Sequence, residues 1–186
     1  AMGDGYAEKL FYLTAKTIAR GVAVDSLEIL RAHGLYFKSV MITAKEKICP
    51  LEEMECDPEH CPYAKGHYDR INKAIYDCVT NEFNITRDVL LQYANAHMVC
   101  PFELGLDVSL FVDGIICDYN YVFDPRVKLR RYFAEGAKGD FLFLVDEAHN
   151  LVDRASSMYS AAIYKEDFLN MRKLLLPYNA KLARLL

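Results

Sequence analysis

The stretch that most constrains this chain runs from Phe141 to His149, where five consecutive apolar residues lead directly into two adjacent carboxylates. A continuous apolar run of this length indicates a strand buried on both faces, as in a parallel sheet. Ligands of open α/β sheets bind beyond the carboxyl ends of the strands. The sequence therefore predicts that Asp146 and Glu147 lie at the edge of a parallel sheet where chemistry is normally done.

The pair also suggests a chemistry. In nucleotide hydrolases, an Asp that ends a buried strand, the Walker B position, holds Mg²⁺. A Glu beside it is placed to orient or deprotonate the attacking water. A strand that simply turns into solvent through acidic residues is the alternative that a bare Asp-Glu pair leaves open.

Other strands of the same sheet are expected at Leu10 to Leu13, Phe37 to Thr43 and Gly114 to Cys117. A helix capped by Asp25 or Ser26 and ended by Gly34 would join the first two in a right-handed crossover. The segment from 14 to 20 carries hydroxyl and basic side chains that can donate hydrogen bonds to phosphates. Taken alone, it is more simply an ordinary polar loop.

The composition changes at Lys47, where an acidic, proline-containing stretch begins. Helices are predicted from Tyr63 to Cys78, from Asn84 or Thr86 through His97, and from Pro101 onward. Residues 47–100 therefore look like an all-helical insertion between sheet strands. The tail from Tyr164 to Leu186 is expected to be amphipathic helix, broken at Pro177.

Six cysteines without a secretory signal point to a reducing compartment, and we expect a cytoplasmic protein. Four thiolates suit a [4Fe–4S] cluster or a structural zinc. The loose Cys-x6-Cys-x4-Cys-x38-Cys spacing favours iron–sulfur, whereas His60 and His67 leave a mixed zinc site open, and unligated thiols are the third possibility. The four candidate ligands are Cys49, Cys56, Cys61 and Cys100.

The other two cysteines, Cys78 and Cys117, are expected in the core, on a helix's apolar face and in an apolar strand. Cys100 would begin a helix, where the dipole favours the thiolate. A net charge of −4 argues against binding DNA by overall charge, so any nucleic-acid contact must be local. No apolar run approaches the length of a membrane span.

Together, Asp146-Glu147-Ala148-His149 and the four-cysteine insertion before it resemble the XPD/DinG-like family of iron–sulfur DNA helicases, which are superfamily-two DEAH-box enzymes. Three further segments are similar to the family's. Residues 11–20 resemble its motif Ia, and those at 100–104 and 117–125 resemble the segments that join the cluster domain back to the motor.

The resemblance implies an α/β fold, namely a partial parallel-sheet, RecA-like P-loop NTPase motor domain with an all-helical iron–sulfur insertion. Its parts would be motor domain 1 over 1–46 and 101–160, the cluster domain over 47–100 and the start of an arch domain over 161–186. The implied cofactors are a [4Fe–4S] cluster, ATP and Mg²⁺. The implied partners are single-stranded DNA, DNA junctions and a second motor domain of the same parent chain, with no membrane.

The resemblance also implies roles for residues. Asp146 would hold Mg²⁺ through water, Glu147 would activate water, and His149 would couple to the second motor domain. The contacts to single-stranded DNA would come from Thr14, Lys16, Thr17 and Arg20.

One departure from the family matters, because the chain contains no Gly-x-x-x-x-Gly-Lys-[Ser/Thr] motif. The family's Walker A lies shortly before the position where this sequence starts. We therefore expect a fragment that carries half of an ATP site and is inactive alone. The alternative from another class is a zinc-stabilised nucleic-acid or protein interaction module without motor activity.

Overall fold

The fold is built on a five-stranded parallel sheet, seen in a computed structural model that describes residues 5–15 and 17–185. The strand order is β3-β2-β4-β1-β5, and every neighbouring pair is parallel. The strands are β1 (Lys9–Thr14), β2 (Ser39–Met41), β3 (Asn84–Ile85), β4 (Gly114–Asp118) and β5 (Phe141–Val145). The predicted α/β class is confirmed, and all strands end at the same edge of the sheet.

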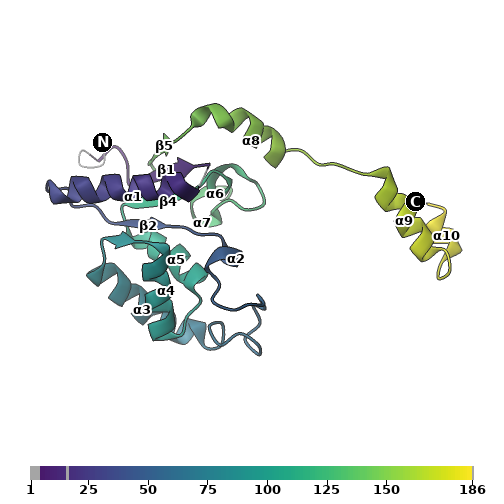
Figure 1. Cartoon of the computed structure of the whole chain (residues 1–186), viewed down its shortest axis with the longest axis horizontal. Helices are drawn as coiled ribbons and strands as arrows, with labels where there is room; N and C mark the ends of the chain where they lie inside the picture. Colours follow the sequence, from purple (N-terminus) through teal and green to yellow (C-terminus); the bar gives the residue numbers. More distant parts are fainter. Residues whose placement is uncertain (1–4, 16, 186) are drawn as a thin grey trace.

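Helix α1 (Thr17–Ala32) joins β1 to β2 and lies across the sheet (Figure 1). It was expected to begin at Asp25 or Ser26 but begins at Thr17, so most of the segment expected as a polar loop is helical. Gly21 is accommodated within the helix. The predicted end is confirmed, because Gly34 has a φ of +98°, a backbone conformation that favours glycine.

The position of β5 differs from the prediction that it is buried on both faces. It is an edge strand, and Leu142, Phe143 and Leu144 are 39, 38 and 46% exposed. Only β1 pairs with it among the described strands. A continuous apolar run therefore indicates a strand that is suited to burial on both faces. In this structure, β5 is only partly buried.

The block from 47 to 100 packs onto β2 as a helical lobe with α5 (Figure 1). Its core residues, among them Ile71, Leu90 and Leu104, belong to the same hydrophobic cluster as Phe11 and Val40 of the sheet. The helices of this lobe are α2 (Lys45–Ile48), α3 (His67–Asn81), α4 (Arg87–His97) and α5 (Pro101–Val108).

The block is not all-helical, which corrects the prediction. Asn84–Ile85 forms β3 and extends the parallel sheet beside β2, with Ser39 opposite Asn84 and Val40 opposite Ile85. After α3 ends, this short segment lies beside β2, and the fully buried Ile85 joins the core. Thr86 then caps α4 through its hydroxyl, which accepts from the Val89 N–H.

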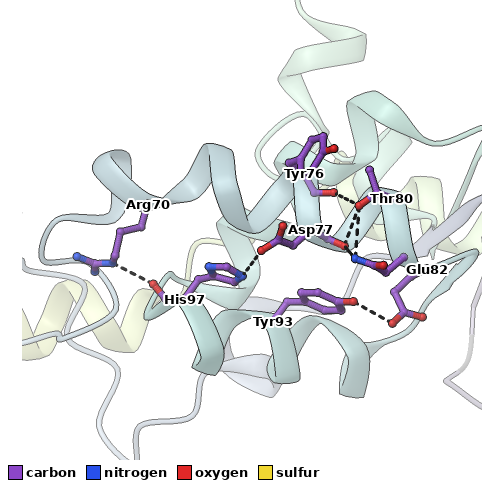
Figure 2. Close-up of polar contacts among 8 residues, drawn as sticks. Arg70, Tyr76, Asp77, Thr80, Glu82, Tyr93 and His97 are labelled. Atoms are coloured by element: carbon purple, nitrogen blue, oxygen red, sulfur yellow. Dashed lines mark hydrogen bonds and ion pairs between the residues drawn. The ribbon is translucent and has the colours of Figure 1, made fainter.

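Polar contacts between α3 and α4 frame the lobe (Figure 2). His97 Nε2 lies 3.1 Å from a carboxylate oxygen of Asp77, and the Tyr93 hydroxyl donates to Glu82 over 3.0 Å. Arg70 donates to the carbonyl of His97 at the end of α4. The contacts of His97 and Arg70 fix the end of α4 from which the chain passes to Cys100, whereas Tyr93 and Glu82 meet at the opposite end of the helix pair (Figure 2).

The remaining elements lie between α5 and the end of the described chain. A buried aromatic cluster packs Phe11 against rings from the segment 132–143. The tail helices stand apart from the sheet (Figure 1), and none of the helices in the described chain is long and apolar enough to cross a membrane. These elements are η1 (Ser109–Phe111), α6 (Asn120–Phe123), α7 (Arg130–Phe133), η2 (Ala148–Asn150), α8 (Leu151–Met158), α9 (Lys165–Leu175) and α10 (Ala180–Ala183).

Candidate functional site

The acidic pair lies where the sequence predicts, immediately after β5 at the carboxyl edge of the sheet. The Asp146 N–H donates to the Leu13 carbonyl over 2.9 Å, which continues the pairing of β5 with β1. The charge of Asp146 also reaches the neighbouring strand, since burial and then Asp146 raise the pKa of Tyr12. Asp146 is therefore presented beside the ends of two parallel strands, as a Walker B Asp requires.

Glu147 has an unusual backbone. Its φ of +48° and ψ of +45° are left-handed, which costs about 1–2 kcal/mol for a residue with a Cβ. Asn150 holds the resulting turn twice. Its side-chain amide donates to Glu147 Oε2 over 3.0 Å, and its backbone N–H donates to the Glu147 carbonyl over 2.9 Å.

The turn opens on a cavity of about 350 Å³, which we call the acidic cavity. Glu147 and Asp153 line it together with Arg154, whose guanidinium donates to the carbonyl of Ala15, directly after β1. The lining residues are Ala15, Glu147, His149, Asn150, Asp153 and Arg154.

The four candidate cysteine ligands line one cavity of about 260 Å³, the cysteine cavity, although one of them lies 39 positions beyond the other three. Cys49 follows α2, Cys100 precedes α5, and Cys56 and Cys61 come from the loop between α2 and α3. Sequence spacing alone did not require this convergence. Cys78 and Cys117 are fully buried elsewhere, which confirms their prediction as core residues.

Burial shifts the pKa of two groups at the cysteine cavity, Cys100 and His67. It raises the pKa of Cys100, although the amides of Glu103 and Phe102 at the start of α5 lower it, so the expected helix-dipole effect is present but outweighed. Burial is also the main reason that the pKa of His67 is lowered. His67 Nδ1 accepts a hydrogen bond from the Cys100 N–H over 3.2 Å, and this nitrogen is therefore occupied.

Lys45 is a cation at this cavity that the sequence reasoning missed. Burial lowers its pKa, but a hydrogen bond to Cys56 and the charges of Cys56, Cys100 and Glu103 together raise the pKa above its usual value. The signal available in the sequence was a lysine four residues before Cys49, on the short helix that precedes this cysteine. Among the described residues, no three His, Cys, Asp or Glu side chains are grouped around a single ion position.

A third, basic cavity of about 620 Å³ lies beside the cysteine cavity and shares Lys45 and Phe102 with it. Carboxylates at Glu46 and Asp118 only partly offset its positive charge. Its cationic lining residues are Arg20, Lys45, Lys47, Lys128, Arg130 and Arg131.

Of the four residues expected to contact DNA, Arg20 lines the basic cavity and Thr14 is fully buried. Arg20 lies 3.6 Å from Asp118 Oδ2 and 3.4 Å from the Thr14 hydroxyl, so Thr14 supports Arg20 rather than facing solvent. Lys16 lies outside the described residues, as does the side chain of Thr17, the first residue of α1.

A parallel α/β sheet with an acidic pair at its carboxyl edge defines a RecA-like motor domain of the kind found in nucleotide hydrolases. The family model DEAD_2 matches residues 17–168, and the chain belongs to this family. The resemblance to XPD/DinG-like helicases is thereby confirmed.

The individual proteins that this chain resembles are longer than the chain itself. A curated chicken (Gallus gallus) protein, the Fanconi anemia group J protein homolog, is 33% identical over 64 residues, 34% of this chain and 5% of that protein. A solved structure described as truncated XPD has a TM-score of 0.57 at 18% identity, covering 89% of this chain and 47% of that chain. A second, described as XPD helicase, has a TM-score of 0.47 at 16% identity, covering 90% and 29%. The chain thus spans less than half the length of each of these relatives.

Proposed function

We propose that this chain supplies part of the first motor domain, together with the cysteine lobe, of an ATP-dependent DNA helicase that moves along single-stranded DNA. The observation that carries the proposal is the position of Asp146 and Glu147 at the carboxyl edge of the parallel sheet. Membership of the DEAD_2 family supports it. The isolated chain would not hydrolyse ATP, because it contains no Walker A sequence to hold the β- and γ-phosphates.

In the proposed reaction, Asp146 would hold Mg²⁺, which would neutralise charge on the phosphates, and Glu147 would orient and deprotonate the attacking water. The side-chain amide of Asn150 donates a hydrogen bond to the Glu147 carboxylate, and both residues line the acidic cavity. His149, which lines the same cavity, is proposed to couple ATP hydrolysis to the second motor domain.

For the DNA, we propose a path through the basic cavity. Phosphates there would meet Arg20, Lys128 and Arg130, and Asp118 would hold Arg20 in position. The contacts to DNA expected from Lys16 and Thr17 belong to the same proposal. Strand separation at DNA junctions, and a place in repair or replication, belong to the same proposal.

For the cysteine cavity, we propose ligation of a [4Fe–4S] cluster by Cys49, Cys56, Cys61 and Cys100. The convergence of four thiol side chains on one cavity fits this group. Four thiolates also suit a structural zinc, and the loose spacing of the four cysteines along the sequence is the feature that favours the cluster. When bound, the cluster would supply a rigid, redox-capable anchor. Lys45 would offset its negative charge, and His67 would orient the Cys100 backbone.

The proposal divides the chain into three domains. Motor domain 1 is formed by 1–46 and 101–160, the cluster domain by 47–100, and the entry to an arch domain by 161–186. The edge of β5 remains available for pairing with further strands of a complete motor domain.

The test uses the full-length protein that contains this chain. DNA-stimulated ATP hydrolysis is expected, and Glu147→Gln should reduce kcat at least a hundredfold while ATP binding, measured by fluorescence of a labelled nucleotide, stays within about twofold. Glu166→Gln, an acidic residue in the first turn of α9, is the matched control and should keep full activity. Hydrolysis that survives Glu147→Gln would contradict the proposed role of the acidic pair.

A further inference from the structure

The turn that carries the acidic pair needs support from outside itself. Glu147 holds a left-handed backbone that its own sequence disfavours. Asn150 stabilises the side after Glu147, through the two hydrogen bonds described above. The side before Glu147 depends on the peptide of Asp146, whose N–H is bound by Leu13.

The carbonyl of Asp146 is bound by Tyr119, whose hydroxyl donates to it. Tyr119 comes from a different part of the chain, directly after β4, and is completely buried. Its backbone N–H also donates to the Thr14 carbonyl over 3.4 Å. The ring is therefore fixed by the core, and its hydroxyl can hold the Asp146 peptide without losing much side-chain freedom.

The surroundings of Tyr119 tie it to the acidic turn rather than to the core alone. Burial, and after it the charges of Asp146 and Glu147, raise the pKa of the Tyr119 phenol, whereas Arg154 lowers it. Four residues further on, the Phe123 carbonyl accepts from the Tyr159 hydroxyl at the end of α8. The segment 119–123 thus touches the acidic turn at its start and the helix that follows this turn at its end.

The residue before Tyr119 faces the other way. Asp118 pairs with Arg20 and lines the basic cavity. Two adjacent residues therefore contact the two candidate sites, one through a carboxylate and one through a phenol. This segment directly follows β4, the strand by which the chain returns from the cysteine lobe to the sheet.

We propose that Tyr119 is a positioning residue for ATP hydrolysis, holding the Asp146 peptide so that both carboxylates of the acidic turn face the nucleotide. The inference deepens the proposed function and rests on it. Tyr119 touches neither water nor nucleotide in this role and acts only through the Asp146 backbone. Removing its hydroxyl should therefore weaken the chemical step while leaving substrate affinity in place.

The test compares Tyr119→Phe with Tyr132→Phe in the full-length protein. Tyr132 is also buried and also makes one hydrogen bond through its hydroxyl, 2.9 Å from the Ser109 hydroxyl, in the aromatic cluster away from the acidic turn. Both substitutions remove one buried hydrogen bond and should lower the melting temperature similarly. Tyr119→Phe alone should lower kcat for ATP about tenfold, with KM for ATP and affinity for DNA within about twofold of wild type.

A second measurement uses the 186-residue chain and does not depend on hydrolysis. Amide hydrogen exchange of residues 146–150 should be several-fold faster in Tyr119→Phe and unchanged in Tyr132→Phe. Equal effects of the two substitutions on kcat and on local exchange would overturn the inference. If the wild-type full-length protein does not hydrolyse ATP, the proposed function fails, and the exchange measurement still decides whether Tyr119 holds the turn.

Discussion

At the scale of single residues, the sequence predicted where the acidic pair lies in the fold better than it predicted which side chains contact it. Asp146 and Glu147 were placed because an apolar run ending in carboxylates has few other structural meanings. The supporting contacts of Tyr119, Lys45 and Asn150 were not predicted, since each joins segments far apart or depends on a turn geometry. Thr14 and Arg20 were expected to contact DNA mainly from the family resemblance, which could not reveal that Thr14 is buried and hydrogen-bonded to Arg20.

The first prediction at this scale concerns the cysteines. In protein purified without oxygen, Cys49→Ser, Cys56→Ser, Cys61→Ser and Cys100→Ser should each lower iron content from about four atoms per chain, together with absorption near 400 nm. Cys78→Ser is the matched control, because this fully buried thiol lies outside the cysteine cavity. It should cost packing but keep iron, and a colourless wild-type protein holding one zinc would contradict the cluster.

At the scale of elements, the helices with clear caps were predicted well, and the sheet edges were not. Thr86 and Pro101 mark the starts of helices, and such residues can be recognised from the sequence alone. The start of α1 carries no such mark. Strand β3 is only two residues long, and its pairing with β2 is set by how α3 packs, so no periodic pattern announces it. The exposure of β5 depends on what lies beside it, which its own residues cannot specify.

The prediction at this scale concerns Arg70, which ties the cysteine loop to α4. Its guanidinium donates to the carbonyl oxygens of Lys65, His97 and Met98 over 2.6 to 3.0 Å. Arg70→Met should therefore lower the free energy of unfolding by roughly 1–3 kcal/mol in urea titrations and speed proteolysis of the loop 49–66. Lys73→Met, an exposed position on the same helix, should change stability by less than about 0.5 kcal/mol. Equal costs for the two variants would show that Arg70 is dispensable.

At the scale of the whole molecule, positive charge is concentrated in one place although the net charge of the chain is negative. The net charge is −4, yet cations gather around the basic cavity, and they come from α1, α2 and the segment 128–131. Composition predicted that any nucleic-acid contact must be local but could not locate the cluster of cations, since these segments are brought together only by the fold. The same holds for the cysteines, whose convergence is a property of the lobe as a whole.

The prediction at this scale concerns salt. Binding of a fluorescent single-stranded oligonucleotide to this chain should be weak and should fall steeply as salt rises, because phosphate contacts release counterions. Lys128→Gln and Arg130→Gln should each reduce the slope of log K against log salt by about 0.7, the value for one phosphate contact on a single strand. Arg172→Gln on the separate helix α9 is the control, and slopes that all stay equal would remove the basic cavity from the DNA path.

The pairing of β3 with β2 has a consequence for anyone who would shorten this protein. Deleting residues 47–100 to obtain a smaller motor would also delete the strand that closes one side of the sheet, leaving the N–H and C=O groups of β2 bare. Bare strand edges recruit other chains and lead to aggregation. A working deletion would therefore need a replacement strand or a charged or proline-containing β2. For the same reason, a natural relative that lost the lobe is expected to carry one of these protections.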